Sequence, residues 1–335
     1  MKTRRTEVEI SINSKNISKD IAPYLLSLTV NEVLEGESST AEIELADRDR
    51  IWTADWFPER GSTCDITVVK IYEGGEERFT FSGWEVDEVE NSFPPNKARI
   101  KLNSVSNNTD SRSINHSQSW EQVKLSKIAS DIAGTSGLEL FYQTQEDPDI
   151  ERAEQKDKSD LGFLKKLCAD NGMIVRVGEG KLIICAEDEL EQADAATVFS
   201  YGDQKLLRFS GRATISEIYS AAHVVYSHGK KKETVEATYS DATKSSGMTL
   251  EINKKVENVA EAERLAKKEL RNKNKDEIKV QLEVVGDFIY SAGNVIELDE
   301  TFGFYSGRYI IERANWKVGG GFKINLDVRK CLSGY

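Results

Sequence analysis

Apolar and polar residues alternate over two long stretches of this chain, and that alternation sets the narrowest limit on how it can fold. Val8, Ile10 and Ile12 are each flanked by polar residues, which is the period-two pattern of a strand that buries one face. The same alternation recurs at Leu26, Leu28 and Val30, at Ala41, Ile43 and Leu45, at Cys64, Ile66 and Val68, at Phe79 and Phe81, and at Ile100 and Leu102. Many short strands separated by turns predict a β-sandwich or β-barrel.

The pattern becomes helical in the middle of the chain. A stretch rich in serine and asparagine, residues 103–119, is expected to be a connector. Helical spacing follows at Val123, Leu125, Ile128, Ile132 and Ala133. A second helix is predicted after Ser159, capped by Ser159 or Asp160, and a hairpin over residues 173–185 follows it. We therefore expect a small α+β unit at about residues 115–195.

Alternation returns from about Leu206 and predicts a second β region that contains one helix. Strands are predicted at residues 218–227, 232–239, 278–285, 294–298, 308–316 and 322–328. The helix is predicted because Val259, Ala262, Leu265, Ala266 and Leu270 share one face. The expected fold is mainly β with an α+β insertion, and the expected domains are 1–112, 113–200 and 201–335. The two β regions could be copies of one fold, although no sequence repeat between them is visible.

Composition limits the partners of the chain. Its 335 residues carry a formal net charge of −12, which argues against a general nucleic-acid binder because phosphates require a cationic surface. An acidic inner wall would suit a channel that DNA passes without sticking, whereas simple solubility is the plainer explanation. No secretory signal and no apolar run of the ~20 residues that span a bilayer are visible. The protein is therefore expected to be made in the cytoplasm.

The residues that usually carry chemistry are scattered. Cys64, Cys168, Cys185 and Cys331 form no C-x-x-C pair and are predicted to be buried free thiols. His223 and His228 are five residues apart in a predicted strand and should point to opposite faces, so a shared metal is not expected. The third histidine, His116, lies in no metal-binding motif.

Two further patterns are explained by strands and turns. The acidic residues Glu85, Asp87, Glu88 and Glu90 are expected to form a solvated strand face and not a catalytic carboxylate pair. The glycines at 319–321 join two predicted strands, whereas a phosphate-binding loop opens a helix after a strand. The chain contains no G-x-S-x-G motif. We therefore predict no catalytic, cofactor-binding or metal-binding residues, and no enzyme.

One loop is unusually aromatic. Trp52, Trp56 and Phe57 lie between two predicted strands. They could anchor a partner at an interface, as loop aromatics often do. Alternatively, they could fold over the end of their own barrel. The sequence favours neither explanation.

An ordered set of short segments carries a resemblance that covers nearly the whole chain. They are residues 17–27, 41–49, 52, 55–61, 119–120, 128–129, 132–134, 137–138, 159–167, 262–266, 291–295 and 307–311. No single segment is decisive, but their order is fairly specific. In these segments the chain resembles the late control protein D family, which forms the baseplate hub of contractile phage tails and phage-tail-like particles.

The resemblance implies a structural protein without cofactors. Family members form a homotrimer in which each subunit has two tube-like β-barrel domains flanking a small α+β domain. Three such subunits give pseudo-sixfold symmetry, which joins a sixfold tail tube to a threefold central spike. The implied partners are the tail tube protein, the central spike protein, and tape-measure and baseplate wedge proteins. DNA would pass through the channel without specific binding. The implied location is the host cytoplasm during assembly and then the tail baseplate of a virion or an R-type bacteriocin.

Two other interpretations stay open. One is a cell-wall-binding or cell-wall-degrading tail-tip protein, with residues 115–195 holding peptidoglycan or another tail protein. The other is the related spike protein of type VI secretion, whose front half is hub-like. That protein continues into a repetitive β-spike, whereas this sequence stops at Tyr335, so a spike is expected on a separate polypeptide.

Overall fold

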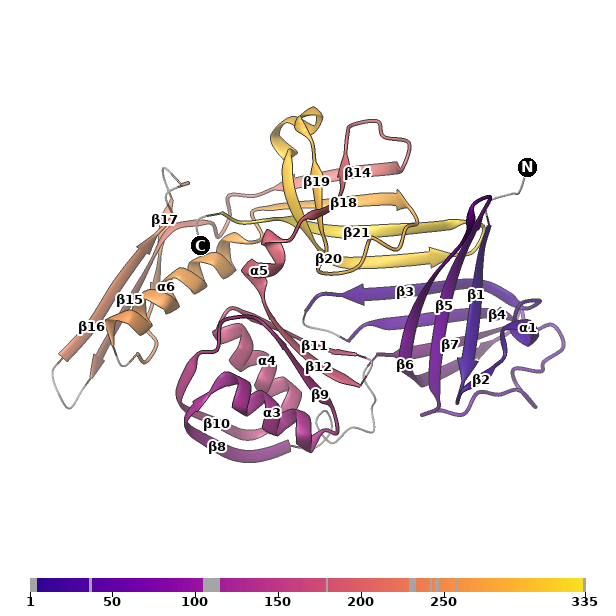
Figure 1. The fold of residues 1–335 in the computed structure, drawn as a ribbon, viewed down its shortest axis with the longest axis horizontal. Coiled ribbons are helices and arrows are strands. Elements are labelled where there is room, and N and C mark those ends of the chain that lie inside the picture. The colour runs from indigo at the N-terminus through magenta and orange to yellow at the C-terminus, as the bar shows by residue number, and fades with distance from the viewer. Residues whose placement is uncertain are drawn as a thin grey trace.

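The computed structural model describes residues 5–35, 38–104, 115–178, 180–228, 233–241, 243–244, 247–256 and 258–333. Figure 1 shows that one long sheet runs through most of the molecule, with two smaller bodies beside it. This sheet has 13 strands, and two- and three-stranded sheets build the smaller bodies. The mainly β fold with an α+β insertion, predicted from the alternation, is confirmed.

The first β unit is a curled, six-stranded antiparallel sheet. Its strands are β1 (Arg5–Ile12), β3 (Leu25–Val33), β4 (Thr40–Ala46), β5 (Thr63–Tyr72), β6 (Gly75–Ser92) and β7 (Lys97–Asn103). Their order is β1-β5-β6-β7-β4-β3, and the short β2 (Lys15–Asn16) and α1 (Ser18–Ile21) follow β1. The first half of β6 pairs with β5 and its second half with β7. This long strand therefore turns the sheet around a core of the alternating apolar residues.

The insertion is an α+β body with its own core. It contains β8 (Asn115–Lys124), α3 (Leu125–Thr135), β9 (Glu139–Gln143), β10 (Asp149–Ser159), α4 (Asp160–Asp170), β11 (Met173–Gly178), β12 (Lys181–Ala186) and α5 (Glu187–Gln192). Both predicted helices are confirmed, and the Ser159 hydroxyl caps α4 by accepting a hydrogen bond from the Gly162 amide at 3.3 Å. Helices α3 and α4 bury their apolar stripes against the strands of the insertion.

The second β unit also has six strands. They are β13 (Ala195–Phe199), β14 (Leu206–Ala213), β18 (Ile278–Val285), β19 (Val295–Leu298), β20 (Gly307–Val318) and β21 (Phe322–Lys330), with a short 3-10 helix, η1 (Glu300–Tyr305), before β20. Their order is β13-β19-β20-β21-β18-β14. The predicted glycine turn joins β20 to β21, and Gly320 there has a φ of 68° that favours glycine.

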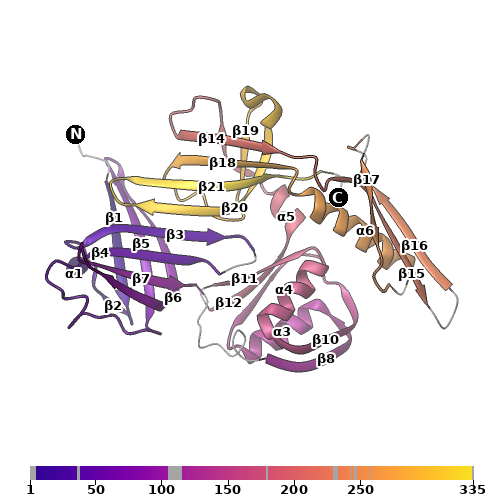
Figure 2. The ribbon, with the colours of Figure 1, turned by 180° about the vertical axis from the view of Figure 1, so that it is seen from behind.

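A further body projects from the second unit between β14 and β18. It consists of the sheet β16-β15-β17, formed by β15 (Tyr219–His228), β16 (Glu233–Ser240) and β17 (Met248–Ile252), covered on one face by α6 (Val259–Asn274). In Figures 1 and 2 it lies at one end of the molecule, far from the first β unit. The predicted apolar stripe of α6 faces this small sheet, as the buried Ala262, Ala266 and Leu270 show.

The two β units share one topology, strand for strand. Taken in chain order, β1, β3, β4, β5, β6 and β7 have the same neighbours as β13, β14, β18, β19, β20 and β21. Two irregularities also match, whereas those in the β5–β6 and β13–β19 pairings have no counterpart. The register shifts between Leu25 and Ser27 in β3 and between Leu206 and Arg208 in β14, and again at Asp87 in β6 and at Glu312 in β20. The one difference in direction is that β1 pairs antiparallel with β5, whereas β13 pairs parallel with β19.

Some local expectations were wrong. The connector predicted at 103–119 includes the start of β8, while residues 105–114 lie outside the described part of the chain. Val123 belongs to β8 and not to the helix. Glu85 is buried, whereas a solvated strand face was expected there. The sequence placed β13 in the insertion, but this strand pairs with β19 of the second unit. The domain boundaries at 112 and 200 remain predictions.

The packing of the long sheet predicts that two aromatic residues contribute very differently to the free energy of unfolding. Trp316 is fully buried among aromatic rings, whereas Phe304 is 67% exposed. Trp316→Ala should lower the free energy of unfolding by about 3–5 kcal/mol because it leaves a cavity. Phe304→Ala, the matched control, should cost about 1 kcal/mol or less. Urea unfolding followed by circular dichroism measures both, and equal losses would contradict this packing.

Candidate functional site: the joint between two β units

The two β units meet edge to edge, and their strands form one continuous sheet. Residues 28–33 of β3 pair antiparallel with residues 313–318 of β20, with Asn31 opposite Asn315 and Thr29 opposite Lys317. The first half of β20 pairs with β19 instead. At this joint, β3, an outer strand of the first unit, therefore pairs with the second half of β20, which no described strand of the second unit covers on that edge.

An aromatic cluster packs beneath this joint. Trp316 lies between rings from both units, with centroids 5.0 Å from Phe79, 5.2 Å from Phe81, 5.9 Å from Phe288 and 5.6 Å from Phe322. The ammonium group of Lys70 lies 5.0 Å above the Phe288 ring and 3.2 Å from the Asp287 carboxylate. Since these contacts cross between the units, they fix the angle of the joint as well as its register.

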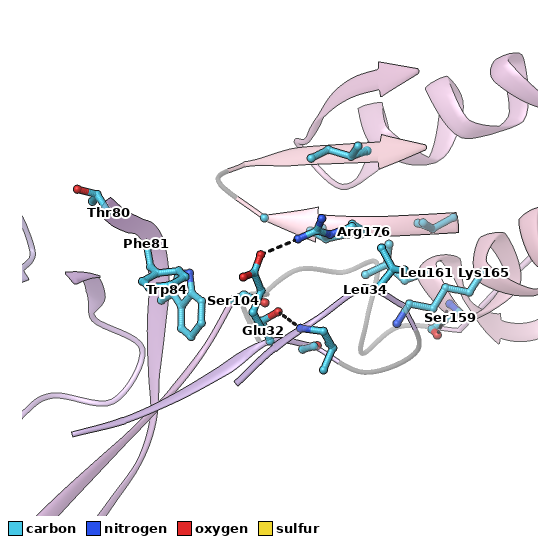
Figure 3. Close-up of a pocket in the computed structure, with 18 of the residues that line it drawn as sticks. Glu32, Leu34, Thr80, Phe81, Trp84, Ser104, Ser159, Leu161, Lys165 and Arg176 are labelled. Carbon is cyan, nitrogen blue, oxygen red and sulfur yellow. Dashed lines mark hydrogen bonds and ion pairs between the residues drawn. The ribbon is translucent and has the colours of Figure 1, made fainter. Parts of the chain in front are cut away.

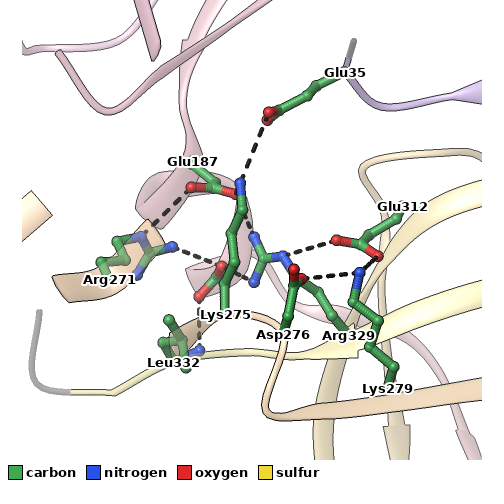
Figure 4. A network of polar contacts seen from close by, with 10 residues as sticks. Glu35, Glu187, Arg271, Lys275, Asp276, Lys279, Glu312, Arg329 and Leu332 are labelled. Carbon is green, nitrogen blue, oxygen red and sulfur yellow. Dashed lines mark hydrogen bonds and ion pairs between the residues drawn. The ribbon is translucent and has the colours of Figure 1, made fainter. Parts of the chain in front are cut away.

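A buried ion network holds the insertion and the projecting body against the second unit. Arg329 of β21 is 1% exposed and lies 2.6 Å from Glu187 of α5. Arg271 of α6 lies 2.6 Å from Glu191 of α5. Figure 4 shows Glu187, Arg271 and Arg329 converging from three parts of the fold. The Leu332 amide also donates to Glu191 at 2.8 Å. No short sequence motif could have revealed this network, because its members are far apart in the chain.

The network is electrostatically matched. Burial raises the pKa of Glu187, but the charges of Arg329, Lys275 and Arg271 outweigh it, so that the pKa is lower than its ordinary value of 4.5. Burial lowers the pKa of Arg329, and the carboxylates of Glu187 and Glu191 reverse that effect and raise it. Both groups are therefore charged at neutral pH. Removing one partner would leave a buried charge without compensation.

The face of the long sheet that points away from the core is polar across eight strands, from β14 through β18, β21, β20, β3, β4 and β7 to the second half of β6. Its basic side chains are Lys97, Arg99, Lys101, Arg208, Arg212, Lys279, Arg313, Lys317 and Lys323, and its acidic side chains are Glu42, Glu44, Asp87, Glu88, Glu90, Glu283, Glu312 and Asp327. Cross-strand pairs balance many of them, for example Lys97 with Glu44 at 2.7 Å and Lys101 with Glu88 at 2.8 Å. The face thus carries both signs of charge.

The aromatic loop between β4 and β5 buries one of its three aromatic side chains and exposes the other two. Trp52 is 3% exposed and contacts Tyr24 and Trp56 edge-on, so it plugs its own barrel. The buried Asp47 carboxylate fixes the loop by accepting a hydrogen bond from the Trp52 amide at 3.0 Å. Trp56 and Phe57 remain 43% and 47% exposed. The structure thus leaves these two side chains accessible to a partner.

A groove of about 450 Å³ lies between the insertion and the first β unit (Figure 3). On one wall Arg176 of β11 lies 3.2 Å from the nearly buried Glu32 of β3, and it also donates to the Ala292 carbonyl at 3.2 Å. Burial raises the pKa of Glu32, and Arg176 opposes that effect. Ser159, Lys165 and aromatic side chains complete the lining. The ion pair ties the insertion to the joint region.

Two of the histidines make contacts with carboxylates, and the cysteines are free thiols. His116 contacts the buried Asp160 at 2.9 Å. His223 bridges Glu251 and Glu236, which raise its pKa above 6.5. The side chain of His228 lies outside the described residues. Within the described ranges, no group of three His, Cys, Asp or Glu residues could hold a metal ion. All four cysteines are free, as predicted. Burial was expected for all of them, but Cys331 is only partly buried.

In the part of the chain that is described, every helix is too short or too polar to cross a membrane.

Comparisons with known proteins agree with this fold. A family model described as YQBQ-like matches residues 174–329. A probable baseplate hub protein of Escherichia phage 186 is 27% identical over 180 residues, which are 52% of this chain but only 43% of that relative. The chain therefore matches less than half the length of this relative. The name of the relative confirms the resemblance to baseplate hub proteins that the sequence indicated.

Two solved structures have the same fold. The 43 kDa tail protein of prophage MuSo2 from Shewanella oneidensis has a TM-score of 0.75 and 16% identity, with 98% of this chain and 99% of that chain covered. The E. coli c3393 protein, a component of the type VI secretion system, has a TM-score of 0.59 and 9% identity, with 99% and 78% covered. At these identities the likeness concerns the fold alone.

The ion network predicts that two arginines on neighbouring strands differ in their effect on stability. Arg329→Met should lower the free energy of unfolding by about 3–5 kcal/mol, because Glu187 and Glu191 would remain buried without it. The matched control Arg313→Met removes a half-exposed side chain 4.0 Å from Asp327 and should cost less than about 1 kcal/mol. Urea unfolding measures both variants. Equal losses would show that the network does not hold the bodies together.

The lowered pKa of Glu187 predicts a pH dependence. Since the folded pKa lies below the unfolded value, the stability that this carboxylate contributes is fully present above about pH 4.5 and is lost as pH falls through the folded pKa. The stability difference between the native chain and Glu187→Gln should therefore shrink on acidification below pH 4.5. Thermal melts between pH 7 and pH 3 measure it. A difference that stays constant or grows over this range would contradict the assignment.

Proposed function

We propose that this chain is the baseplate hub protein of a contractile phage tail or of a phage-tail-like particle. The observation that carries the proposal is the duplication: two β units with the same strand order and two bulges at matching positions are joined edge to edge in one chain. The baseplate hub name of the phage relative supports it. The function is mechanical, and the chain acts through the ring that it forms.

Duplication gives a physical reason for a symmetry adaptor. A ring of three subunits would contain six β units in nearly equivalent positions, so its rim could meet a sixfold tail tube. The insertion and the projecting body occur once per subunit, so the same ring would present threefold features to a central spike. Closed rings of this kind bury the contacts of every subunit equally. Tape-measure and baseplate wedge proteins are further partners in this proposal.

The diameter of such a ring is large enough for a central channel. Each subunit would contribute eight strands to the wall, and about 24 strands at ~4.8 Å spacing give a backbone circumference of ~115 Å and a diameter of ~37 Å, or more if the strands tilt. The polar outer face of the sheet would line it. The acidic wall expected from the net charge stays a prediction. On this face basic and acidic side chains occur in similar numbers, and many of them are paired. Mixed, paired charges would hold DNA or protein cargo only weakly.

The other candidates gain less support. A cell-wall hydrolase needs two carboxyl groups that flank a substrate cleft, whereas the groove described above offers one carboxylate, Glu32, held by Arg176. The acidic cluster on β6 contributes to cross-strand pairs with Lys101 and Arg99 instead. The likeness to the type VI component of E. coli extends the same fold to another injection machine. The hub function proposed here depends on a ring of subunits and not on a catalytic cleft.

The proposal predicts a defined oligomer with two different binding ends. Purified protein, alone or mixed with the tail tube and spike proteins from the same gene cluster, should give the mass of three subunits by native mass spectrometry. One trimer should bind one spike trimer and one tube hexamer, because six β units face the tube. Monomers that bind neither partner at micromolar concentrations would contradict the proposal.

A further inference from the structure

The chain contains a second pair of strand edges of the same kind as those in the β3–β20 joint. By topology, β14 corresponds to β3 and the second half of β6 corresponds to the second half of β20. In the described part of the chain, β14 pairs with β18 on one edge and with no strand on the other. From Glu88 to Ser92, β6 pairs only with β7. Exposed edges of this kind bind other strands unless they are covered.

We propose that β14 of one subunit pairs antiparallel with residues 88–92 of β6 in the next subunit, in the register of the β3–β20 joint. This inference rests on the proposed function, and it identifies the surface by which one copy binds another. The ring would then repeat one joint six times, alternately within a subunit and between subunits. Every subunit would use both of its open edges.

The matched bulges fix the register of the new joint. Counting from the bulge in each strand, Arg212 of β14 takes the place of Asn31 in β3, and Ser210 takes the place of Thr29. Likewise, Glu90 of β6 takes the place of Asn315 in β20, and Ser92 takes the place of Lys317. Since Asn31 faces Asn315 and Thr29 faces Lys317, Arg212 should face Glu90 and Ser210 should face Ser92 of the neighbour.

The charges of the two edges are complementary. On β14 the exposed charged side chains are Arg208 and Arg212, and on the second half of β6 they are Asp87, Glu88 and Glu90. The register places a guanidinium opposite a carboxylate at its centre. Opposite charges across two strands favour pairing and exclude a like-charged edge. A β14 edge would therefore repel another β14 edge, which directs the association head to tail around a ring.

The exposed aromatic side chains fit the same joint. Within the subunit, Phe288 of the β18–β19 loop packs on Phe79 of β6 at 5.7 Å. The corresponding loop of the first unit carries Trp56 and Phe57. When the additional bulge of β6 between Phe81 and Trp84 is counted, the position in the second unit that corresponds to Phe79 is Tyr305, whose ring contacts the exposed Phe304 at 5.2 Å. The new joint would bring Trp56 and Phe57 of one subunit to Tyr305 and the adjacent Phe304 of the next. It would cover the aromatic surface that the single chain leaves open.

Cysteine cross-linking tests the register directly. In a Cys331→Ser background, Ser210→Cys combined with Ser92→Cys should form disulfides between subunits on mild oxidation and give covalent trimers. Thr29→Cys combined with Lys317→Cys is the matched positive control, because it occupies the equivalent sites of the internal joint and should cross-link within one chain. Ser210→Cys with Glu88→Cys, four residues out of register, should not cross-link.

Charge reversal provides a second, independent variant pair. Arg212→Glu alone and Glu90→Arg alone should each weaken assembly at least tenfold, measured as the protein concentration at which half of the subunits are assembled. The double reversal should restore most of that loss, whereas two variants that had merely misfolded would not rescue each other. Circular dichroism on each single variant checks its folding.

The outcomes separate this inference from the proposed function. A trimer by mass in which the 210–92 pair fails to cross-link, while the 29–317 control succeeds, would overturn the proposed joint and leave the hub function standing. Absence of any assembly with the tube and spike proteins would overturn the hub function itself. Cross-linking at 210–92 together with rescue by charge reversal supports the joint.

Discussion

A β-strand with an unpaired edge must find a partner or be shielded, and this requirement organises the whole molecule. One chain contains two copies of a six-stranded unit, and each copy offers an outer strand and a half-free long strand. The β3–β20 pairing satisfies one edge of each copy within the chain. The remaining two edges are of the same two types, so the proposed joint would satisfy them with other copies of the chain. Assembly would in that case continue the strand pairing that folding begins.

The buried ion network and the long sheet stabilise different parts of the arrangement. The sheet sets how the β units follow one another, whereas the network around Arg329 sets where the insertion and the projecting body sit on them. Its carboxylates come from the short helix α5, which has no extensive apolar face of its own. Paired charges specify one orientation, since any other would leave a charge buried and alone. The insertion and the projecting body, which each occur once per subunit, are thereby held in one orientation on the two similar β units.

The sequence predicted what is local and missed what is distant. Alternation of apolar residues located most strands of both β units, and apolar spacing located α3, α4 and α6. Val123 was misplaced because it fits a strand as well as a helix. The pairing of β3 with β20 and of Glu187 with Arg329, 142 residues apart, leaves no mark in a single sequence. The duplication was equally hidden, because topology and bulge positions are conserved between the units while their side chains are not. Of the aromatic loop, the sequence identified the residues but not that Trp52 turns inward while Trp56 and Phe57 stay exposed.

The central claim is that identical joints close the sheet into a ring, and a cryo-electron microscopy reconstruction of the assembled particle tests it most directly. The account predicts one uninterrupted wall of about 24 strands, in which β14 of each subunit lies beside β6 of the next at the same spacing as β3 beside β20. A reconstruction in which the sheets of neighbouring subunits are separated, or meet through the insertion instead, would contradict it.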